Sequence, residues 1–193
     1  MQTLIGRSLL ALAALSGCDD GKTASAPPAG RVVAIAPAAD EGDTLCDPRP
    51  AGSAPPPLSL PPLADGAQPS MRGPLWVNLW ATWCPPCVEE LPLVRQLEAE
   101  LKQAGSAARV QLVSVDATAD AVQSFAAKHP EAQGSLRVAD VGALEPWLPT
   151  IGLDTGATLP IHLFVDAHGK VACTRTGAIR ASDLPRIRKL LTP

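Results

Sequence analysis

The stretch Trp80-Ala81-Thr82-Trp83-Cys84-Pro85-Pro86-Cys87 places two cysteines three positions apart, where a predicted strand passes into a predicted helix. If Cys84 caps the helix, Cys87 lies about one turn further on the same face, so the two sulfur atoms can bond. Cys84 then lies among unpaired backbone N–H groups at the positive end of the helix dipole, and both stabilise a thiolate, the attacking species in disulfide exchange. Pro85 and Pro86 suit the first helical positions, where the N–H that proline lacks would be unpaired. The stretch predicts dithiol redox chemistry, with Cys84 as the exposed nucleophile and Cys87 as the buried resolving thiol.

A CxxC pair can also form half of a metal site. Zinc would need two further ligands at a suitable spacing. The sequence contains no second CxxC, and His129, His162 and His168 lie far from the pair. We therefore expect no metal, and no cofactor beyond the redox-active disulfide Cys84-Cys87 itself. A metal carrier that uses the two thiols as ligands is the alternative of a different class.

Predicted strands and helices lie on both sides of the motif along the chain. The predicted strands span residues 75–80, 110–115, 161–165 and 170–174, and the last two form a hairpin. The predicted helices run from Cys87 to Gly105, over residues 119–128, and from an N-cap at Ser182 to Leu191. The order strand, helix, strand, helix, hairpin, helix predicts the α/β class, as a three-layer domain with a mixed central sheet flanked by helices.

Length and charge exclude several classes of protein. A chain of 193 residues favours one domain. The formal net charge is −3, and no run of Lys and Arg is interleaved with aromatic residues, so nucleic-acid binding is not expected. No stretch of about 18 or more apolar residues follows the N-terminal region, which argues against a protein with several membrane spans.

The N-terminal residues have the pattern of a targeting signal. Arg7 precedes an apolar run over residues 9–15 that is too short to span a bilayer. The run ends in Leu15-Ser16-Gly17-Cys18, which resembles the lipobox of bacterial lipoproteins. This resemblance implies a signal peptide over residues 1–17, a lipid on Cys18, and a periplasmic protein anchored to the inner membrane or, alternatively, to the outer membrane. An ordinary signal peptide with an incidental cysteine is the other interpretation.

The composition changes between the N-terminal signal and the predicted domain. Of the 21 prolines, 11 lie between Asp19 and Arg72, where no helical or strand period is sustained. Such a segment buries too little apolar surface to offset its ordering entropy, so we expect a Pro/Ala-rich tether over residues 18–56. The predicted domain then covers residues 57–193, and its first part, around residues 58–63, can pack as an edge segment.

The motif from Trp80 to Cys87, followed by Glu90-Leu91-Pro92, resembles the TlpA/ResA-like branch of the thioredoxin superfamily. The resemblance covers about Pro74 to Leu191 and implies a thioredoxin-like fold. Members of this branch are extracytoplasmic thiol:disulfide oxidoreductases, many of them membrane-anchored reductases that serve cytochrome c maturation or copper-site assembly. The resemblance thus implies a monomeric reductase of protein disulfides, such as those of an apocytochrome c or a copper-site protein, with a membrane dithiol as electron donor. A disulfide oxidase or isomerase for secreted proteins is the alternative.

The same resemblance assigns a role to an acidic residue near the motif. Asn78 occupies the position of the buried Asp of thioredoxin, so the carboxylate that would accept a proton there is missing. In ResA-like proteins a Glu at the position of Glu90 lies near the thiols and tunes proton transfer, which implies a catalytic role for Glu90. The alternative is a solvated acidic residue near a helix N-terminus, as we interpret Glu89.

The resemblance also implies a surface that contacts the substrate. Leu159-Pro160 precedes a predicted strand as the active-site cis-proline of thioredoxins does, with Ile161 where family members usually have Thr. A cis peptide bond at Pro160 would present a backbone edge to the substrate chain beside the CxxC pair. Pro149 is the competing proline. Trp83, with Pro85, Pro86 and Leu159, is expected to contact the substrate, although ordinary packing is the alternative for Trp83.

Two cysteines remain outside these assignments. Some TlpA-like proteins have a second disulfide that joins the N-terminal segment to the sheet, which implies a structural disulfide between Cys46 and Cys173. Oxidising compartments also favour this pairing, and two free thiols are the alternative. Trp76, Trp80 and His162 are expected in the core, with His162 as a satisfied buried residue rather than a ligand.

Overall fold

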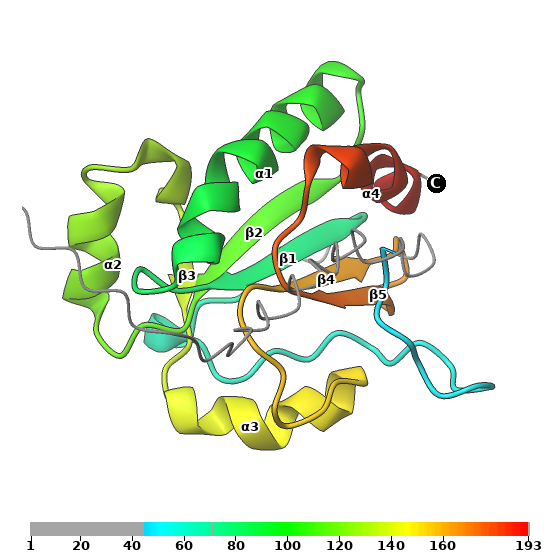
Figure 1. Cartoon of the computed structure of the whole chain (residues 1–193), viewed down its shortest axis with the longest axis horizontal. Coiled ribbons are helices and arrows are strands. Elements are labelled where there is room, and N and C mark those ends of the chain that lie inside the picture. Colours follow the sequence, from blue (N-terminus) through cyan, green and yellow to red (C-terminus); the bar gives the residue numbers. More distant parts are fainter. Residues whose placement is uncertain (1–44, 71, 193) are drawn as a thin grey trace, which may run out of the picture. The chain divides into compact units, whose positions relative to one another are not determined.

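Five strands form one mixed sheet in the order β3-β2-β1-β4-β5 (Figure 1). Along the chain they are β1 (Leu75–Trp80), β2 (Arg109–Ser114), β3 (Leu136–Arg137), β4 (Ile161–Val165) and β5 (Val171–Thr176). β1 runs parallel to β2, as does β3, whereas β4 is antiparallel to both β1 and β5. The computed structural model describes residues 45–70 and 72–192.

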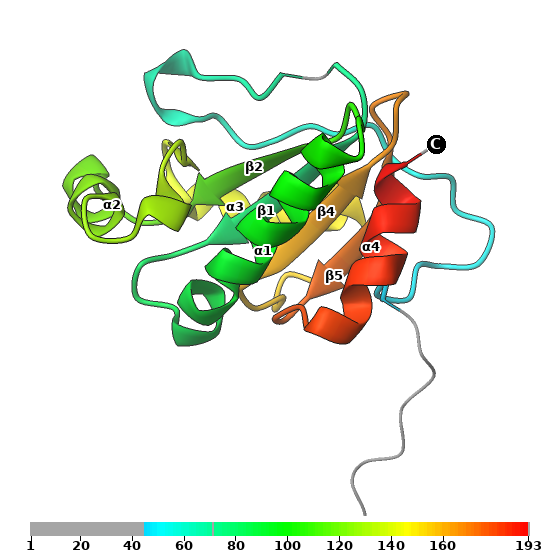
Figure 2. The same ribbon diagram turned by 90° about the horizontal axis from the view of Figure 1, so that it is seen from above.

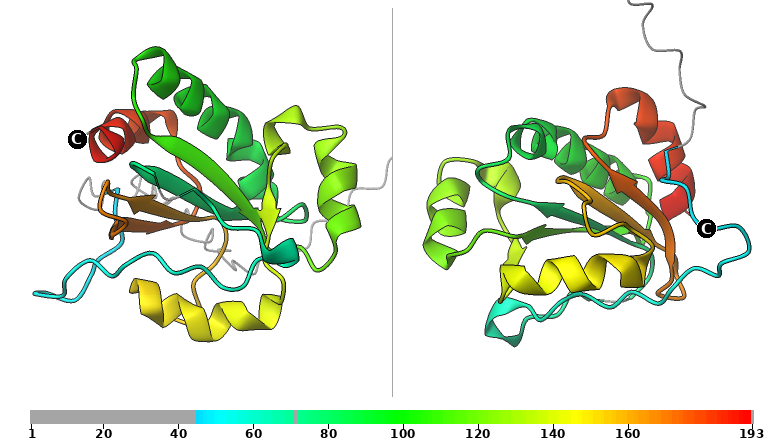
Figure 3. Two further views of the ribbon diagram at one scale, coloured as in Figure 1. Left: turned by 180° about the vertical axis from the view of Figure 1, so that it is seen from behind. Right: turned by 60° about the horizontal axis from the view of Figure 1, so that its bottom comes forward.

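Helices cover both faces of this sheet. They are α1 (Pro85–Gln103), α2 (Ala119–Ala126), α3 (Leu144–Trp147) and α4 (Leu184–Leu191). α1 and α4 lie on one face, α3 lies on the other, and α2 lies at the side of the sheet that ends in β3 (Figures 1, 2 and 3). The predicted three-layer α/β fold with a mixed central sheet is therefore confirmed.

One part of the core lies between the sheet and α1, and buried residues of α3, the following 3-10 turn and α4 extend it, such as Trp147, Ile151 and Ile187. All six residues of β1 are buried, and Trp76 and Trp80 are fully enclosed, as expected. The inward face of α1 contributes aliphatic side chains at helical spacing, namely Leu91, Val94, Leu97 and Leu101. Full burial of each such side chain contributes about 1.5–3 kcal/mol to folding. Packing of α1 on β1 thus fixes the strand-to-helix junction that carries the CxxC pair.

Two elements were not predicted from the sequence. β3 has only two residues, too few to show a period of alternation. α3 is one short turn between two 3-10 turns, Val141–Ala143 and Leu148–Ile151, so this region shows no sustained helical repeat.

The expected start of the last helix is wrong by one residue, because the N-cap is Asp183 instead of Ser182. Ser182 is exposed and lies inside a 3-10 turn, Ala181–Asp183, and α4 begins after Asp183. The Asp183 carboxylate accepts a hydrogen bond of 2.8 Å from the backbone N–H of Arg180. Asp183, rather than Ser182, therefore organises this turn.

The segment before residue 57 is bonded to the sheet instead of standing free. The backbone N–H of Asp47 donates to the carbonyl of Thr174 (2.7 Å), and the N–H of Val171 donates to the carbonyl of Pro56 (2.8 Å). Residues 45–56, which the composition assigned to the tether, thus cover the open edge of β5 (Figure 3). The physical reason is that an edge strand has unpaired backbone groups, and a proline-rich segment still offers carbonyls to them. The expected signal peptide and the rest of the expected tether lie outside the described residues.

Residues 58–63 run from the β4–β5 turn to the opposite edge of the sheet, where the end of the segment packs as the expected edge segment. The N–H of Leu58 donates to the carbonyl of Gly169 in that turn (2.8 Å). Leu63 forms an isolated bridge with Val138, and the N–H of Ala139 donates to the carbonyl of Pro62 (2.8 Å). The indole of Trp147 donates to the carbonyl of Ser59. Among the helices of the described residues, none is long and apolar enough to cross a membrane.

Candidate active site

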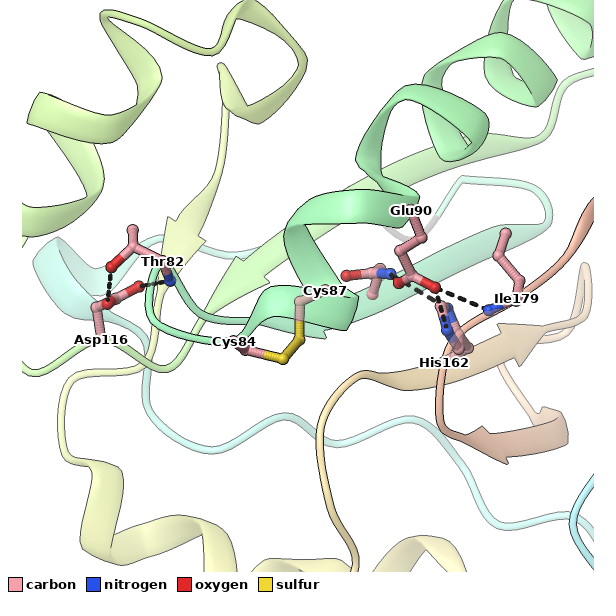
Figure 4. Close-up of a disulfide and its surroundings, with 8 residues drawn as sticks. Thr82, Cys84, Cys87, Glu90, Asp116, His162 and Ile179 are labelled. Carbon is pink, nitrogen blue, oxygen red and sulfur yellow. Dashed lines mark hydrogen bonds and ion pairs between the residues drawn. A yellow bond between two sulfur atoms is a disulfide. The ribbon is translucent and has the colours of Figure 1, made fainter. Parts of the chain in front are cut away.

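The CxxC pair lies at the N-terminus of α1, where the chain leaves β1. Cys84 is the N-cap residue, with extended backbone angles and no side-chain cap, and its carbonyl accepts the first helical hydrogen bond from Val88 (3.1 Å). Pro85 and Pro86 occupy the first two helical positions, as expected. Cys84 and Cys87 are joined in a disulfide with an S–S distance of 2.03 Å (Figure 4).

The exposure of the two cysteines differs in the expected direction but by little. Cys84 is 4% exposed and Cys87 is fully buried. The description of Cys84 as an exposed residue is therefore wrong for the disulfide state. The physical reason is the bond itself, because it holds the Cys84 sulfur against a sulfur that is fully enclosed. The exposed side chain beside it is Trp83, at 66%.

A buried carboxylate anchors the loop that precedes Cys84. Asp116, only 2% exposed, lies just beyond the end of β2. It accepts hydrogen bonds from the Thr82 backbone N–H (3.0 Å), the Thr82 hydroxyl (2.6 Å) and the Ser114 hydroxyl (2.7 Å) (Figure 4). The sequence analysis missed Asp116 and Thr82, and the only available signal was an Asp directly after a buried strand.

Glu90 is buried one helical turn beyond Cys87, at 4% exposure. Its Oε1 accepts from Asn78 Nδ2 (2.6 Å), and its Oε2 accepts from the backbone N–H of Ile179 (2.8 Å) (Figure 4). The alternative of a solvated acidic residue is therefore wrong for Glu90, whereas its neighbour Glu89 is exposed.

His162 joins the same polar cluster from β4. It is fully buried, as expected for a core residue, and its Nδ1 accepts a hydrogen bond from Trp76 Nε1 (3.2 Å). Its Nε2 lies 3.4 Å from Glu90 Oε2. The contact between His162 and Glu90 was not predicted from the sequence, because it depends on the register in which β4 pairs with β1.

The Leu159–Pro160 peptide bond is cis. The pairing of Ile161 with Leu79 places Pro160 opposite the end of β1, from which the CxxC loop leaves. Pro160 is buried and Leu159 is half-buried. Pro149, the competing proline, lies in the 3-10 turn that follows α3.

A second disulfide joins Cys46 to Cys173 on β5. It ties the segment over residues 45–56 to the sheet across a sequence separation of 127. Cys18, the expected lipidation site, lies outside the described residues. Within residues 45–70 and 72–192, no group of three or more His, Cys, Asp and Glu side chains could hold a metal ion.

A protein-family model matches most of the described domain and identifies the family of this chain. The model of the Redoxin family matches residues 68–191, which include the CxxC pair, Glu90, His162 and Pro160. The chain belongs to the Redoxin family. The resemblance to TlpA/ResA-like members of the thioredoxin superfamily is likewise confirmed by the relatives of this Redoxin chain.

Two curated relatives are thiol-disulfide proteins. The chain is 25% identical over 126 residues to the thiol-disulfide oxidoreductase ResA of Halalkalibacterium halodurans, a match that covers 62% of each chain. It is 28% identical over 121 residues to the thiol:disulfide interchange protein DsbE homolog of Paracoccus denitrificans, covering 60% of each. This Redoxin chain therefore spans about three fifths of the length of these relatives.

A solved structure supports the fold. A thioredoxin-family thiol:disulfide interchange protein from Chlorobium tepidum matches with a TM-score of 0.55 and 23% identity. The match covers 73% of this chain and 99% of that structure. The Redoxin domain therefore has the thioredoxin-like fold.

Proposed function

We propose that this Redoxin is an extracytoplasmic thiol:disulfide oxidoreductase that reduces disulfides of other proteins. The observation that carries the proposal is the Cys84–Cys87 disulfide at the N-terminus of α1, beside the exposed Trp83. A helix N-terminus stabilises the thiolate of its N-cap cysteine, and a thiolate is the species that attacks a disulfide. The relatives named as thiol-disulfide oxidoreductases support the same class of reaction.

The reaction runs through a mixed disulfide. The Cys84 thiolate attacks one sulfur of the substrate disulfide, and the other substrate sulfur leaves as a thiolate that takes a proton from water. Cys87 then loses its proton and attacks Cys84, which re-forms the Cys84–Cys87 disulfide and releases the second substrate thiol. Two electrons pass from the dithiol to the substrate, and no cofactor is required. A membrane dithiol donor then restores the reduced pair.

Glu90 is the proton acceptor for Cys87 in this scheme. The two residues are three positions apart on α1, so their side chains lie on the same face of the helix. The carboxylate is buried and held by Asn78 and Ile179, which keeps it in place between cycles. The resemblance to ResA-like proteins supports the same role.

The substrate surface of this monomeric protein comprises the exposed or half-buried apolar residues around the disulfide. They are Trp83, Pro85, Pro86 and Leu159. Pro160 precedes β4 and is buried, and its carbonyl accepts a hydrogen bond from the N–H of Gly177 (2.8 Å), so we propose that it positions Leu159 for the substrate. The proposed substrates are an apocytochrome c or a copper-site protein, and the proposed location is the periplasmic side of the inner membrane, with a lipid anchor on Cys18. These finer assignments rest on the lipobox and on the resemblance.

Pro85 and Pro86 support the reducing direction. A hydrogen bond from a backbone N–H to an anionic sulfur contributes about 1.5–3 kcal/mol, and neither proline can donate one. The Cys84 thiolate is thus less stabilised than in a CxxC pair with two donor residues, so the reduced form gives up electrons more readily.

Measurement of the Cys84–Cys87 reduction potential by equilibration with glutathione tests this proposal. We expect the pair to stay largely oxidised at redox ratios that fully reduce a strong oxidase, and we expect replacement of Pro85-Pro86 by Gly-His to raise the potential. A wild-type potential near about −120 mV, the value of a strong oxidase, would favour the oxidase alternative. Stoichiometric binding of copper or zinc that is lost in Cys84→Ser would favour the carrier.

A further inference from the structure

His162 is a buried titratable residue to which the exchange reaction assigns no role. It lies on β4, two residues after Pro160, and pairs with Asn78 across β1. Three elements meet at this point, because Asn78 comes from β1, Glu90 from α1 and His162 from β4. All three side chains are buried, so none of their polar atoms is served by bulk water.

The contacts of the imidazole fix its tautomer. Trp76 Nε1 and Asn78 Nδ2 each lie 3.2 Å from Nδ1 of His162. An indole N–H and an amide NH₂ can only donate, so Nδ1 must accept. The proton of the neutral imidazole therefore lies on Nε2, the atom that faces Glu90.

The Nε2–H group has spare donor capacity. Its distance of 3.4 Å from Glu90 Oε2 exceeds the range of about 2.7–3.2 Å for a formed N–H···O hydrogen bond. Nε2 makes no other hydrogen bond among the described residues. In the disulfide state His162 thus aims an unused donor at the Glu90 carboxylate.

The two oxygens of Glu90 differ in their remaining capacity. Oε2 accepts from Ile179 and is the oxygen that faces His162, so a bond from Nε2–H would occupy its second lone pair. Oε1 accepts only from Asn78 and keeps one lone pair free. Once His162 bonds Oε2, Oε1 is therefore the oxygen that can take a proton.

We propose that His162 is a positioning residue for Glu90: its Nε2–H closes the 3.4 Å gap and bonds Oε2 while Oε1 accepts the Cys87 proton. This inference rests on the proposed function. As the mixed disulfide resolves, the proton passes from Cys87 to Glu90, the Cys87–Cys84 bond forms, and the bond from Cys84 to the substrate breaks. The electron pair leaves on the substrate sulfur, which takes a proton from water. When the donor dithiol reopens the pair, Cys87 leaves as a thiolate and recovers its proton from Glu90.

Two matched substitutions separate this role from simple packing. His162→Gln places an amide NH₂ near the position of Nε2, so it keeps a donor for Glu90. His162→Asn places its amide near the position of Nδ1, so it keeps a partner for Trp76 but loses the donor. Quenched single-turnover experiments on the full chain follow the formation and the decay of the mixed disulfide with a disulfide-bonded peptide.

We expect His162→Asn to slow decay of the mixed disulfide about tenfold or more, the loss associated with one hydrogen bond to a charged group, while its formation is unchanged. We expect His162→Gln to restore the decay rate to within about threefold of wild type. In a Glu90→Gln background, His162→Asn should have no further effect. Equal slowing by Asn and Gln, or an additive effect in the Glu90→Gln background, would overturn the proposal.

A measurement on the unaltered chain covers the case in which both variants fail to fold. The imidazole ¹⁵N chemical shifts of His162 should show a neutral ring with its proton on Nε2. A ring with its proton on Nδ1 would overturn the proposal. If the wild-type chain forms no mixed disulfide at all, the proposed reaction fails, and the role of His162 in it fails too. If the wild-type mixed disulfide forms and decays, and His162→Asn matches wild type, only the role of His162 fails.

Discussion

The two disulfides of this chain contain the same chemical bond but lie in different surroundings. Cys84–Cys87 spans a sequence separation of 3 at a helix N-terminus, and Cys46–Cys173 spans a separation of 127 at the edge of the sheet. In the chain-entropy model the first closure contributes about 2 kcal/mol to stability and the second about 5 kcal/mol. The short bridge contributes little to holding the fold together, so its surroundings are available for chemistry.

The neighbours of the two bridges show the same division. Around Cys84–Cys87 lie Asp116, which binds the loop before Cys84, and Glu90, the proposed proton acceptor. Around Cys46–Cys173 lie backbone hydrogen bonds between β5 and the segment over residues 45–56. The short disulfide thus lies among buried polar side chains, whereas the long one ties a distant segment to the edge of the sheet.

Serine substitutions at the four cysteines should break this comparison most clearly. Cys84→Ser should abolish reduction of a disulfide-bonded peptide, because it removes the attacking sulfur. Cys87→Ser should instead accumulate a mixed disulfide with the substrate, seen on non-reducing gels. The double variant Cys46→Ser with Cys173→Ser is the matched control and should keep the exchange activity at a temperature where it is folded. If only Cys84→Ser traps substrate, the roles of nucleophile and resolving thiol are reversed.

Stability should respond in the opposite order. The double variant Cys46→Ser with Cys173→Ser should lose about 5 kcal/mol of unfolding free energy in urea, because the unfolded chain regains the entropy of a long loop. Cys87→Ser should lose about 2 kcal/mol on the same basis. In wild type, mild reduction should open Cys84–Cys87 first, since structural disulfides have the lower potentials. Alkylation of both Cys46 and Cys173 in the native, non-reduced protein would contradict this assignment.

The sequence predicted those parts of the molecule whose signals are local. The apolar runs over residues 75–80 and 161–165 match β1 and β4, because buried strands have continuous apolar sequences. The start of α1 followed from Cys84 and the two prolines, which act within one turn. By contrast, the docking of residues 45–56 on β5 depends on hydrogen bonds between segments more than a hundred residues apart, such as Arg49 to Val171.

The same distinction holds within the site. The motif itself identified Cys84, Cys87 and Glu90, which share one helix. It did not identify His162, whose partner Asn78 lies 84 positions earlier, or Asp116, which is 34 positions from Thr82. Both residues reach the site through strand register, and register is not visible in a local pattern.

The smallest expected effect concerns the contact between Asp116 and Thr82, which holds the loop before Cys84. Weakening this contact should change the reactivity of Cys84 and leave the Cys46–Cys173 disulfide unchanged. The Asp116 carboxylate accepts from three donors, two of them on Thr82, two residues before Cys84. With its amide oxygen at the position of Oδ2, Asp116→Asn keeps the hydrogen bonds from the Thr82 N–H and the Ser114 hydroxyl. The new NH₂ group then faces the Thr82 hydroxyl, whose oxygen must accept instead of donating. We therefore expect Asp116→Asn to cost about 1–2 kcal/mol of unfolding free energy through weakened hydrogen bonds to a former charge. Thr82→Val removes only the hydroxyl contact and should cost about 1 kcal/mol or less, and the two changes should not add, because they remove the same interaction.

Both variants should change the rate at which the reduced Cys84 thiol reacts with iodoacetamide, since the loop that carries it is less fixed, while the reductant concentration that opens Cys46–Cys173 stays as in wild type. An unchanged Cys84 rate in both variants would show that packing of α1 on β1, and not Asp116, holds the nucleophile in place.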